Sequence, residues 1–150
     1  MLTIKHKVHE EPPFNPVYSA AGDPPSKRKI LQAALHLFVQ KSVDGVTVRE
    51  IAAEAGYTNP VLFKYFPAKE AVAVYLFESC YEQLFDRLNA AVTSGLPFDQ
   101  RLEAILEVFF SQMEQDMEAF LFVQDHLREM WPRVSKRIRG KSILALIRSV

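Results

Sequence analysis

The sequence predicts an all-α protein in which a small helix-turn-helix head stands on a larger helical body. Three observations predict this fold class. Apolar residues recur at intervals of three and four from Ser26 onward, and no long stretch alternates with a period of two. Capping residues and glycines stand at the ends of these periodic segments. The 150 residues, of which 49% are hydrophobic and 24% charged, are enough for a folded core.

Residues 1–25 contain five of the nine prolines and are predicted to form a flexible, proline-rich leader. Proline donates no backbone hydrogen bond and restricts the residue before it, so regular structure is disfavoured there. Phe14, Val17 and Tyr18 are the leader residues that could dock onto the folded part.

The head is predicted over residues 26–72 and begins with a helix from Ser26, its expected N-cap, to Lys41. Asp44 and Gly45 then interrupt the apolar spacing. The core side of this first helix is expected to carry Ile30, Leu31, Ala34, Leu35, Leu37 and Phe38.

A second helix is predicted from Thr47 to Gly56. Thr47 and Glu50 have the spacing of a capping box, in which each side chain bonds the backbone N–H of the other residue. Gly56 is a typical residue just after a helix end. Thr58 is expected to cap a third, short helix over residues 59–66, and Pro67 ends it.

The body is predicted over residues 73–150. Its helices are expected at 68–93, 99–115 and 118–130, followed by a last segment, 134–150, that begins basic and becomes apolar. The chain stops within that apolar pattern, so the body is expected to be partial.

The net charge is zero, but the charge is unevenly distributed along the chain. Residues 26–73 carry a net charge of +3, residues 74–131 carry −8, and residues 132–150 carry +6. The positive head can attract an anionic partner. The basic residues after 132 are expected to pair with the acidic helices of the body, since opposite charges attract within one small domain.

Two short helices joined by a three-residue turn form a helix-turn-helix pattern, and the third helix has one free face. At about 100° per residue, Leu62 and Phe66 point inward together. The opposite face can read base edges in a major groove, and nearby basic and hydroxyl groups can bind phosphates. The predicted DNA-binding residues are Lys27, Arg28, Thr47, Arg49, Thr58, Asn59, Pro60, Val61, Phe63, Lys64, Tyr65 and Lys69.

Residues 30–72 resemble the DNA-binding domain of the TetR family of bacterial transcriptional regulators. The resemblance is carried by ILQAALHLF at 30–38, TVREIAAEAG at 47–56 and LFKYFPAKEA at 62–71. It implies that Thr58 caps the recognition helix and that the residue at Lys69 holds a phosphate. The chain departs from the family at Phe63, where tyrosine is common, and at Pro60, where glycine or another small residue is common.

The resemblance also implies that the body binds a ligand and forms dimers. Family members usually continue for two more long helices, which build the dimer interface, so the chain is expected to be truncated at its C-terminus and the complete protein to be a homodimer. A small hydrophobic effector is the implied ligand. Its candidate residues, which are equally consistent with plain core, are Phe109, Met113, Met117 and Phe120.

Several classes of protein are excluded or disfavoured. No catalytic motif is present, so no enzyme, cofactor or metal site is expected. Cys80 is the only cysteine and lies on an apolar stripe, which indicates a core residue. There is no signal peptide and no apolar run long enough to span a membrane, so a cytoplasmic location without membrane contact is expected.

The sequence therefore predicts a sequence-specific DNA-binding regulator, a repressor that leaves double-stranded operator DNA when an effector binds. The alternative is a truncated helical interaction protein of the same fold that does not bind an operator productively.

Overall fold

The computed structural model describes residues 18–150, and every regular element in that part of the chain is a helix. The all-α prediction is therefore confirmed for these residues. The first 17 residues of the predicted leader, with Phe14 and Val17, lie outside the described residues. In the rest of the leader, Tyr18 and Ser19 are buried, residues 20–22 are exposed, and Pro25 already belongs to the first helix. None of the described helices combines the length and apolarity that a membrane-spanning segment needs.

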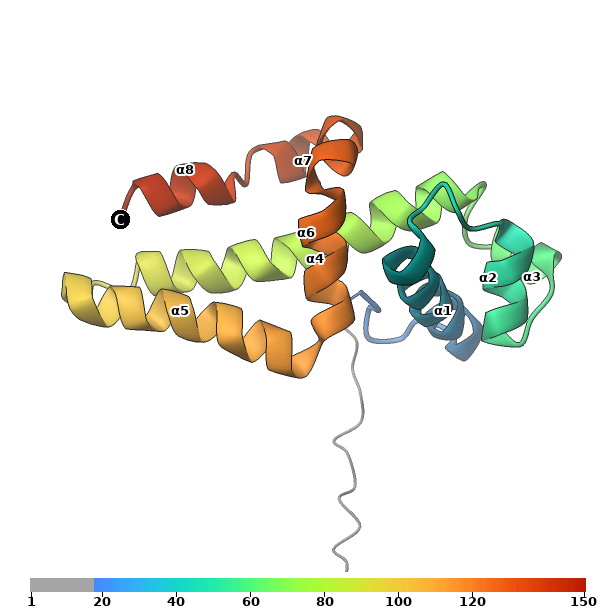
Figure 1. Cartoon of the computed structure of the whole chain (residues 1–150), viewed down its shortest axis with the longest axis horizontal. Helices are drawn as coiled ribbons and strands as arrows, with labels where there is room; N and C mark the ends of the chain where they lie inside the picture. The colour runs from blue at the N-terminus through green and yellow to red at the C-terminus, as the bar shows by residue number, and fades with distance from the viewer. Residues whose placement is uncertain (1–17) are drawn as a thin grey trace, which may run out of the picture.

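The head consists of α1 (Pro25–Lys41), α2 (Val48–Ala55) and α3 (Asn59–Phe63), at the right of Figure 1. The expected N-cap of the first helix was wrong. Pro24 occupies that position, with Pro25 in the first helical turn, where a missing N–H has no cost. The expected core residues of α1, Ile30 to Phe38, are all buried.

The loop between α1 and α2 requires a glycine at position 45. A Cβ atom on Gly45 would lie 2.3 Å from the carbonyl oxygen of Lys41, which is closer than real atoms approach. The chain can therefore turn back tightly after α1 only because this side chain is absent. That turn places α2 across α1, the largest helix–helix contact of the head.

The body is built along α4 (Lys69–Val92), which starts in the head and runs across the molecule (Figure 1). Against it pack α5 (Phe98–Gln115), on one side, and α6 (Met117–Met130), which also contacts α1. The helix predicted over 68–93 and its two successors are thus present, within one or two residues of the predicted ends.

One hydrophobic core extends from the head into the body. Phe38 of α1 stacks on Phe122 of α6, with ring centroids 5.9 Å apart, and Phe77 of α4 meets Phe122 edge-on. A smaller cluster, around Leu88 and Ile105, joins α4 to α5 at the far end. Cys80 lies in the larger core, where burial raises the pKa of its thiol, so its prediction as an inert core residue is confirmed.

The last segment, 134–150, contains two short helices. After the short 3-10 turn η1 (Trp131–Arg133), it forms α7 (Lys136–Arg139) and α8 (Ile143–Arg148). Gly140 separates them, and Ser142 caps α8 by accepting a hydrogen bond from the N–H of Ala145. The Tyr81 hydroxyl holds the break, because it donates to the carbonyl of Lys141 and accepts from the N–H of Ile143.

The predicted pairing between the basic tail and the acidic body is confirmed. Arg137 and Lys141 both donate to the Glu82 carboxylate of α4, and Lys141 also lies 3.0 Å from Asp86. The hydrogen bond of Arg137, as the main cause, and that of Lys141, as the next, hold the pKa of the Glu82 carboxyl below its usual value. The contacts fix α7 and the start of α8 alongside α4.

Candidate nucleic-acid interface

The capping box predicted at the start of α2 is present. The N–H of Glu50 donates to the Thr47 hydroxyl, at 3.2 Å, and the N–H of Thr47 donates to the Glu50 carboxylate, at 2.8 Å. Lys41 also bonds this carboxylate, and its hydrogen bond is the main reason that the pKa of Glu50 is lowered. Thr47 is therefore engaged in fixing α2, while Arg49, two residues later, is exposed.

The turn after α2 sets the position of α3. Gly56 adopts a left-handed conformation, with φ of 79°, and the N–H of Tyr57 returns to the carbonyl of Ala52. Thr58 occupies the N-cap position of α3, but its hydroxyl makes no capping hydrogen bond, so that part of the prediction was wrong. The Thr58 side chain is exposed and can bond another partner.

The third helix is shorter than predicted, since it ends at Phe63 instead of residue 66. Leu62 is fully buried and Phe66 nearly so, which confirms that they anchor this segment to the core. Pro60 and Lys64 are exposed as expected. Phe63, which lies at the flank of the free face, is half exposed.

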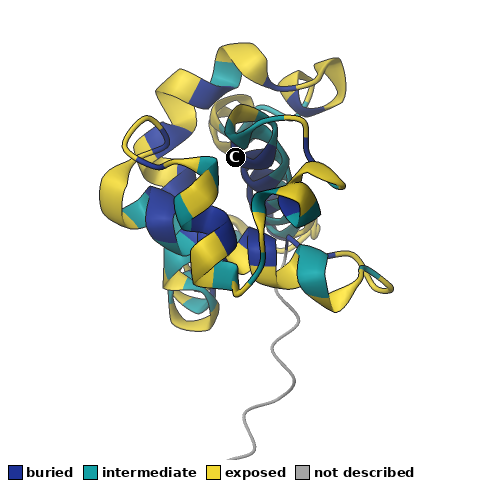
Figure 2. Cartoon of the chain, turned by 90° about the vertical axis from the view of Figure 1, so that its right-hand side faces the viewer, coloured by how far each residue is buried: buried dark blue, intermediate teal, exposed yellow. Residues whose placement is uncertain are grey.

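Two residues of the free face are less available than the helical wheel indicates. Val61 is partly buried and packs against the edge of the core, and Asn59 is also only partly exposed. The reading face of α3 is thus centred on Pro60, Phe63 and Lys64. Figure 2 looks onto this end of the molecule and shows exposed residues on the outer side of the head.

The hydroxyl groups of Tyr65 and Ser26 lie 2.6 Å apart and form a hydrogen bond that joins the end of the α3 segment to the start of α1. Ser26 was predicted as an N-cap and Tyr65 as a DNA-binding residue, and neither prediction includes this contact. When Ser26 is the donor, the Tyr65 hydroxyl keeps its own proton for a phosphate oxygen.

Lys69 lies at the start of α4 with its ammonium against three backbone carbonyls. The Nζ atom is 3.0 Å from the Val43 oxygen, 3.4 Å from that of Asp44 and 2.8 Å from that of Val46. These contacts occupy its three N–H donors and brace the loop between α1 and α2. A phosphate contact by Lys69, which stays a prediction, would require the ammonium to leave some of them.

The basic residues at the start of α1 differ in availability. Lys27 pairs with Asp23 at 3.1 Å and lies over the ring of Tyr75, so its charge is directed toward the body. Arg28 is exposed, although its Nε atom donates to the carbonyl of Asp23. Arg28 is therefore better placed than Lys27 to reach a partner.

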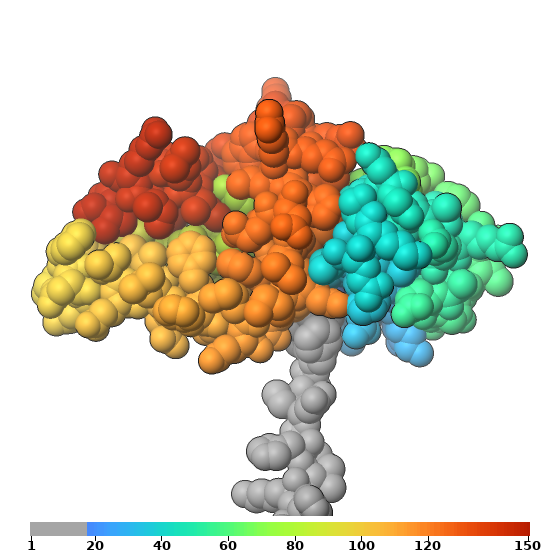
Figure 3. Space-filling model, viewed as in Figure 1, coloured from blue at the N-terminus to red at the C-terminus, as the bar shows by residue number. Residues whose placement is uncertain are grey.

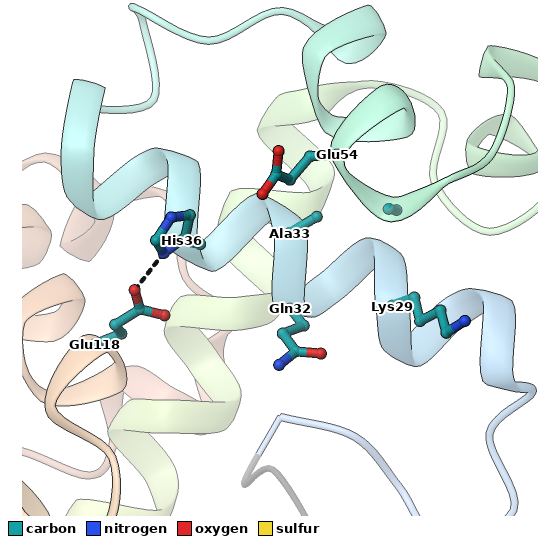
Figure 4. A pocket seen from close by; sticks show the side chains of 7 residues that line it. Lys29, Gln32, Ala33, His36, Glu54 and Glu118 are labelled. Atoms are coloured by element: carbon teal, nitrogen blue, oxygen red, sulfur yellow. Dashed lines mark hydrogen bonds and ion pairs between the residues drawn. The ribbon is translucent and has the colours of Figure 1, made fainter.

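The head meets the body beside an open cavity of about 470 Å³ (Figure 4). His36 of α1 and Glu118 of α6 lie on its wall, with the His36 Nδ1 atom 2.5 Å from the carboxylate. This pair could not be predicted from sequence, because no local pattern relates two residues 82 positions apart. The lining residues are Lys29, Gln32, Ala33, His36, Glu54, Ala55 and Glu118.

The four predicted effector residues are not brought around either of the cavities described for this chain. A second cavity, of about 320 Å³, lies between Tyr18 and α4. Phe109, Met113 and Phe120 are partly buried, and Met117 is exposed. Within residues 18–150, no group of three or more His, Cys, Asp or Glu side chains is placed to hold a metal ion.

Comparison with known proteins connects this geometry to a family. Residues 30–76 match the family described as bacterial regulatory proteins, tetR family. Over 115 residues the chain is 26% identical to the HTH-type transcriptional repressor KstR2 of Rhodococcus jostii (strain RHA1), covering 77% of this chain and 56% of that protein. Over 113 residues it is 27% identical to the HTH-type transcriptional activator FasR of Mycolicibacterium smegmatis, covering 74% and 51%.

The chain thus spans about half the length of these two relatives. Among solved structures, the ketosteroid transcriptional regulator KstR2 of Mycobacterium tuberculosis shares the fold. Its TM-score is 0.68 at 23% identity, over 77% of this chain and 58% of that one. The matched residues, 30–76 of the 150, contain the whole helix-turn-helix unit described above, and in this part the chain is similar to the tetR family of bacterial regulatory proteins.

Proposed function

We propose that this chain is a sequence-specific DNA-binding transcriptional regulator, with α3 as the helix that enters the major groove. One observation carries the proposal. A five-residue helix is anchored by the fully buried Leu62 while it presents Pro60, Phe63 and Lys64 outward from a head of net positive charge. A short helix held in this way, projecting from a rigid support, is what base reading in a groove requires.

Each outward side chain has a chemical role in this arrangement. Lys64 can donate to the O6 and N7 atoms of guanine. At the edge of the reading face, the partly buried Val61 can contact a thymine methyl group, and the partly buried Asn59 can bond an adenine. Phe63 offers an apolar contact where the family commonly has a phosphate-bonding tyrosine.

Phosphate contacts would orient the head on the duplex. Arg28, Arg49 and the unbonded hydroxyl of Thr58 are exposed beside the reading face, and Tyr65 can donate its hydroxyl proton as described. Thr47 and Lys27 are engaged within the protein, since the N–H and hydroxyl of Thr47 bond Glu50 and the Lys27 ammonium pairs with Asp23, so a phosphate contact by either would require these bonds to be released. These contacts fix register without reading sequence.

We further infer that the protein acts as a repressor and that a small hydrophobic effector releases it from DNA. The head and body share one core, and α4 runs through both, so a ligand that moves α4 or α6 also moves the head. The partly buried Phe109, Met113 and Phe120 remain the candidate contacts for that ligand. The fold neighbour described as a ketosteroid regulator supports an apolar effector class.

Selection of bound DNA sequences from a random duplex pool, followed by fluorescence anisotropy, tests the DNA-binding proposal. The chain should enrich a two-fold symmetric sequence, and Lys64→Ala should change the preferred base with a loss of roughly 1–3 kcal/mol in discrimination. Lys136→Ala, an exposed lysine on α7, is the matched control and should change neither.

Affinity should also fall linearly on a logarithmic salt scale, because phosphate binding releases counterions. Failure to enrich any sequence, with affinity flat in salt, would favour the alternative of an interaction protein. For the repressor proposal, transcription in vitro from a promoter overlapping the selected site should fall when the chain is added and recover with an apolar effector.

A further inference from the structure

His36 and Glu118 form a polar contact between the head and the body that the proposed function does not use. His36 lies on α1 and Glu118 in the first turn of α6, and Figure 4 shows the pair beside the open cavity. The imidazole Nδ1 atom is 2.5 Å from a carboxylate oxygen of Glu118. Because α6 lies directly beside the head (Figures 1 and 3), this contact joins the two regions next to their shared core.

Both nitrogen atoms of the His36 ring have a partner. The ring Nε2 atom lies 3.1 Å from the side-chain amide nitrogen of Gln40, one turn later on α1. An amide nitrogen only donates and an ionised carboxylate only accepts. The neutral ring therefore carries its proton on Nδ1, donates it to Glu118, and accepts a hydrogen bond from Gln40 at Nε2.

The same geometry accepts a second proton on the ring. Protonation of Nε2 places a positive charge beside the Glu118 carboxylate, and rotation of the Gln40 amide presents its oxygen to the new N–H. The contact with Glu118 then becomes an ion pair with a charge-assisted hydrogen bond. The side chains of His36 and Glu118 are 42% and 41% exposed, so the ring exchanges protons with solvent without any opening of the core.

The charged groups around this pair are mostly acidic. Lys29 of α1 and Glu54 of α2 line the same cavity as His36 and Glu118. Asp116, the N-cap of α6, lies near Glu118: its pKa is raised by burial and, to a smaller degree, by the Glu118 charge. These groups are three carboxylates and one ammonium, so a positive charge on the ring is attracted by its surroundings.

We propose that His36 and Glu118 form a pH-sensitive clamp, which holds the head against the body more firmly when the His36 ring is protonated. Histidine is the side chain whose charge ordinarily changes between pH 5 and 8. The two residues are 82 positions apart in the sequence, so the pairing belongs to the folded state. The clamp therefore stabilises the folded protein most at the acidic end of this range, and its contribution is lost as the pH rises. The proposal does not rest on DNA binding.

Urea unfolding of the full chain at about pH 5.5 and about pH 8 tests the proposal. The wild-type chain, His36→Gln, Glu118→Gln and the double variant form a double-mutant cycle, which gives the coupling of the two side chains as a ratio of unfolding equilibrium constants. The coupling should be about two- to fivefold at the lower pH, as for other exposed ion pairs, and close to 1 at the higher pH. The remaining histidines, His6, His9 and His126, are the same in every variant, so their titration cancels.

Glu54→Gln is the matched control, because Glu54 lines the same cavity and no hydrogen bond within residues 18–150 joins it to His36. In its background the coupling should keep the wild-type dependence on pH. Nitrogen NMR of the His36 ring at about pH 8 is a second readout, and the proton should reside on Nδ1. Circular dichroism shows that each variant remains folded.

Three results would overturn the proposal. One is a coupling between His36 and Glu118 that is equal at the two pH values. The second is a loss of its pH dependence in the Glu54→Gln background. The third is a neutral His36 ring with its proton on Nε2, since that ring could not donate to Glu118 through Nδ1.

Discussion

In the head, α2 and α3 have eight and five residues and are held by hydrogen bonds at their ends, whereas α4 and α5 in the body have 24 and 18 residues and are held mainly by side-chain packing. The head covers its apolar side chains except around Phe63, while the body leaves a whole face of α5 exposed. The two regions nevertheless share one core through the Phe38–Phe122 contact. The head thus combines short helices with local end contacts, and its core continues into the body.

The largest expected effect comes from the shared core. Phe122→Ala removes a fully buried ring that contacts both α1 and α4, and it should lower the free energy of unfolding by about 3–5 kcal/mol. Because the core is continuous, amide hydrogen exchange in α2 should accelerate together with exchange in α6. Phe110→Ala serves as the control, because this ring is 57% exposed and its removal should change the free energy of unfolding little. Unchanged exchange in α2 would show that head and body unfold separately.

A smaller effect is expected where the body braces the head. Lys69→Met removes the ammonium from three carbonyls of the α1–α2 loop and should cost about 1–3 kcal/mol. Lys64→Met, at an exposed site, should leave stability unchanged in the same urea titration. DNA binding should show the opposite pattern, because Lys64→Met removes a base contact from the reading face while the Lys69 ammonium is engaged with the loop. Each lost phosphate contact makes the slope of log affinity against log salt shallower by about 0.9. A shallower slope for Lys69→Met would assign it a phosphate role as well.

The two threonine N-caps of the head, Thr47 of α2 and Thr58 of α3, provide a direct comparison. Thr47→Ala removes the hydroxyl that accepts the N–H of Glu50, keeps the backbone bond to the Glu50 carboxylate, and should destabilise the protein by about 1 kcal/mol. Thr58→Ala breaks no capping bond and should stay within about 0.5 kcal/mol. Thermal unfolding of both variants measures the difference. Equal losses would mean that the Thr58 hydroxyl does cap α3.

The smallest effect concerns pH and the contact between α7 and α4. The pKa of Glu82 is lowered in the folded state, so its ion pairs stabilise the protein above the unfolded pKa of about 4.3 and are lost as the pH falls through the lower folded value. Glu82→Gln should therefore cost up to about 1 kcal/mol at pH 7 and progressively less below pH 4. Glu54→Gln, whose carboxylate has no ion pair within residues 18–150, should show no such dependence.

The site could be predicted from sequence where its determinants are close together along the chain. The capping box at Thr47, the turn at Gly56 and the inward pair Leu62 and Phe66 were all predicted correctly. The contacts that change the availability of Tyr65 and Lys69 could not be predicted, since their partners lie 39 and 23–26 residues away. Similarly, the exposure of Asn59 and Val61 depends on how α3 sits against the rest of the head.

The sequence by itself determined the helical class, the boundaries of the first six helices to within a few residues, and the resemblance to the tetR family, because apolar spacing, caps and turn glycines act over one or two helical turns. Only the tertiary structure decided which charged and hydroxyl groups are engaged within the protein, that Tyr18 joins the core, and that α5 retains a second, uncovered apolar face. Periodicity shows that a helix has apolar sides, but which of them is buried depends on the helices that pack against it.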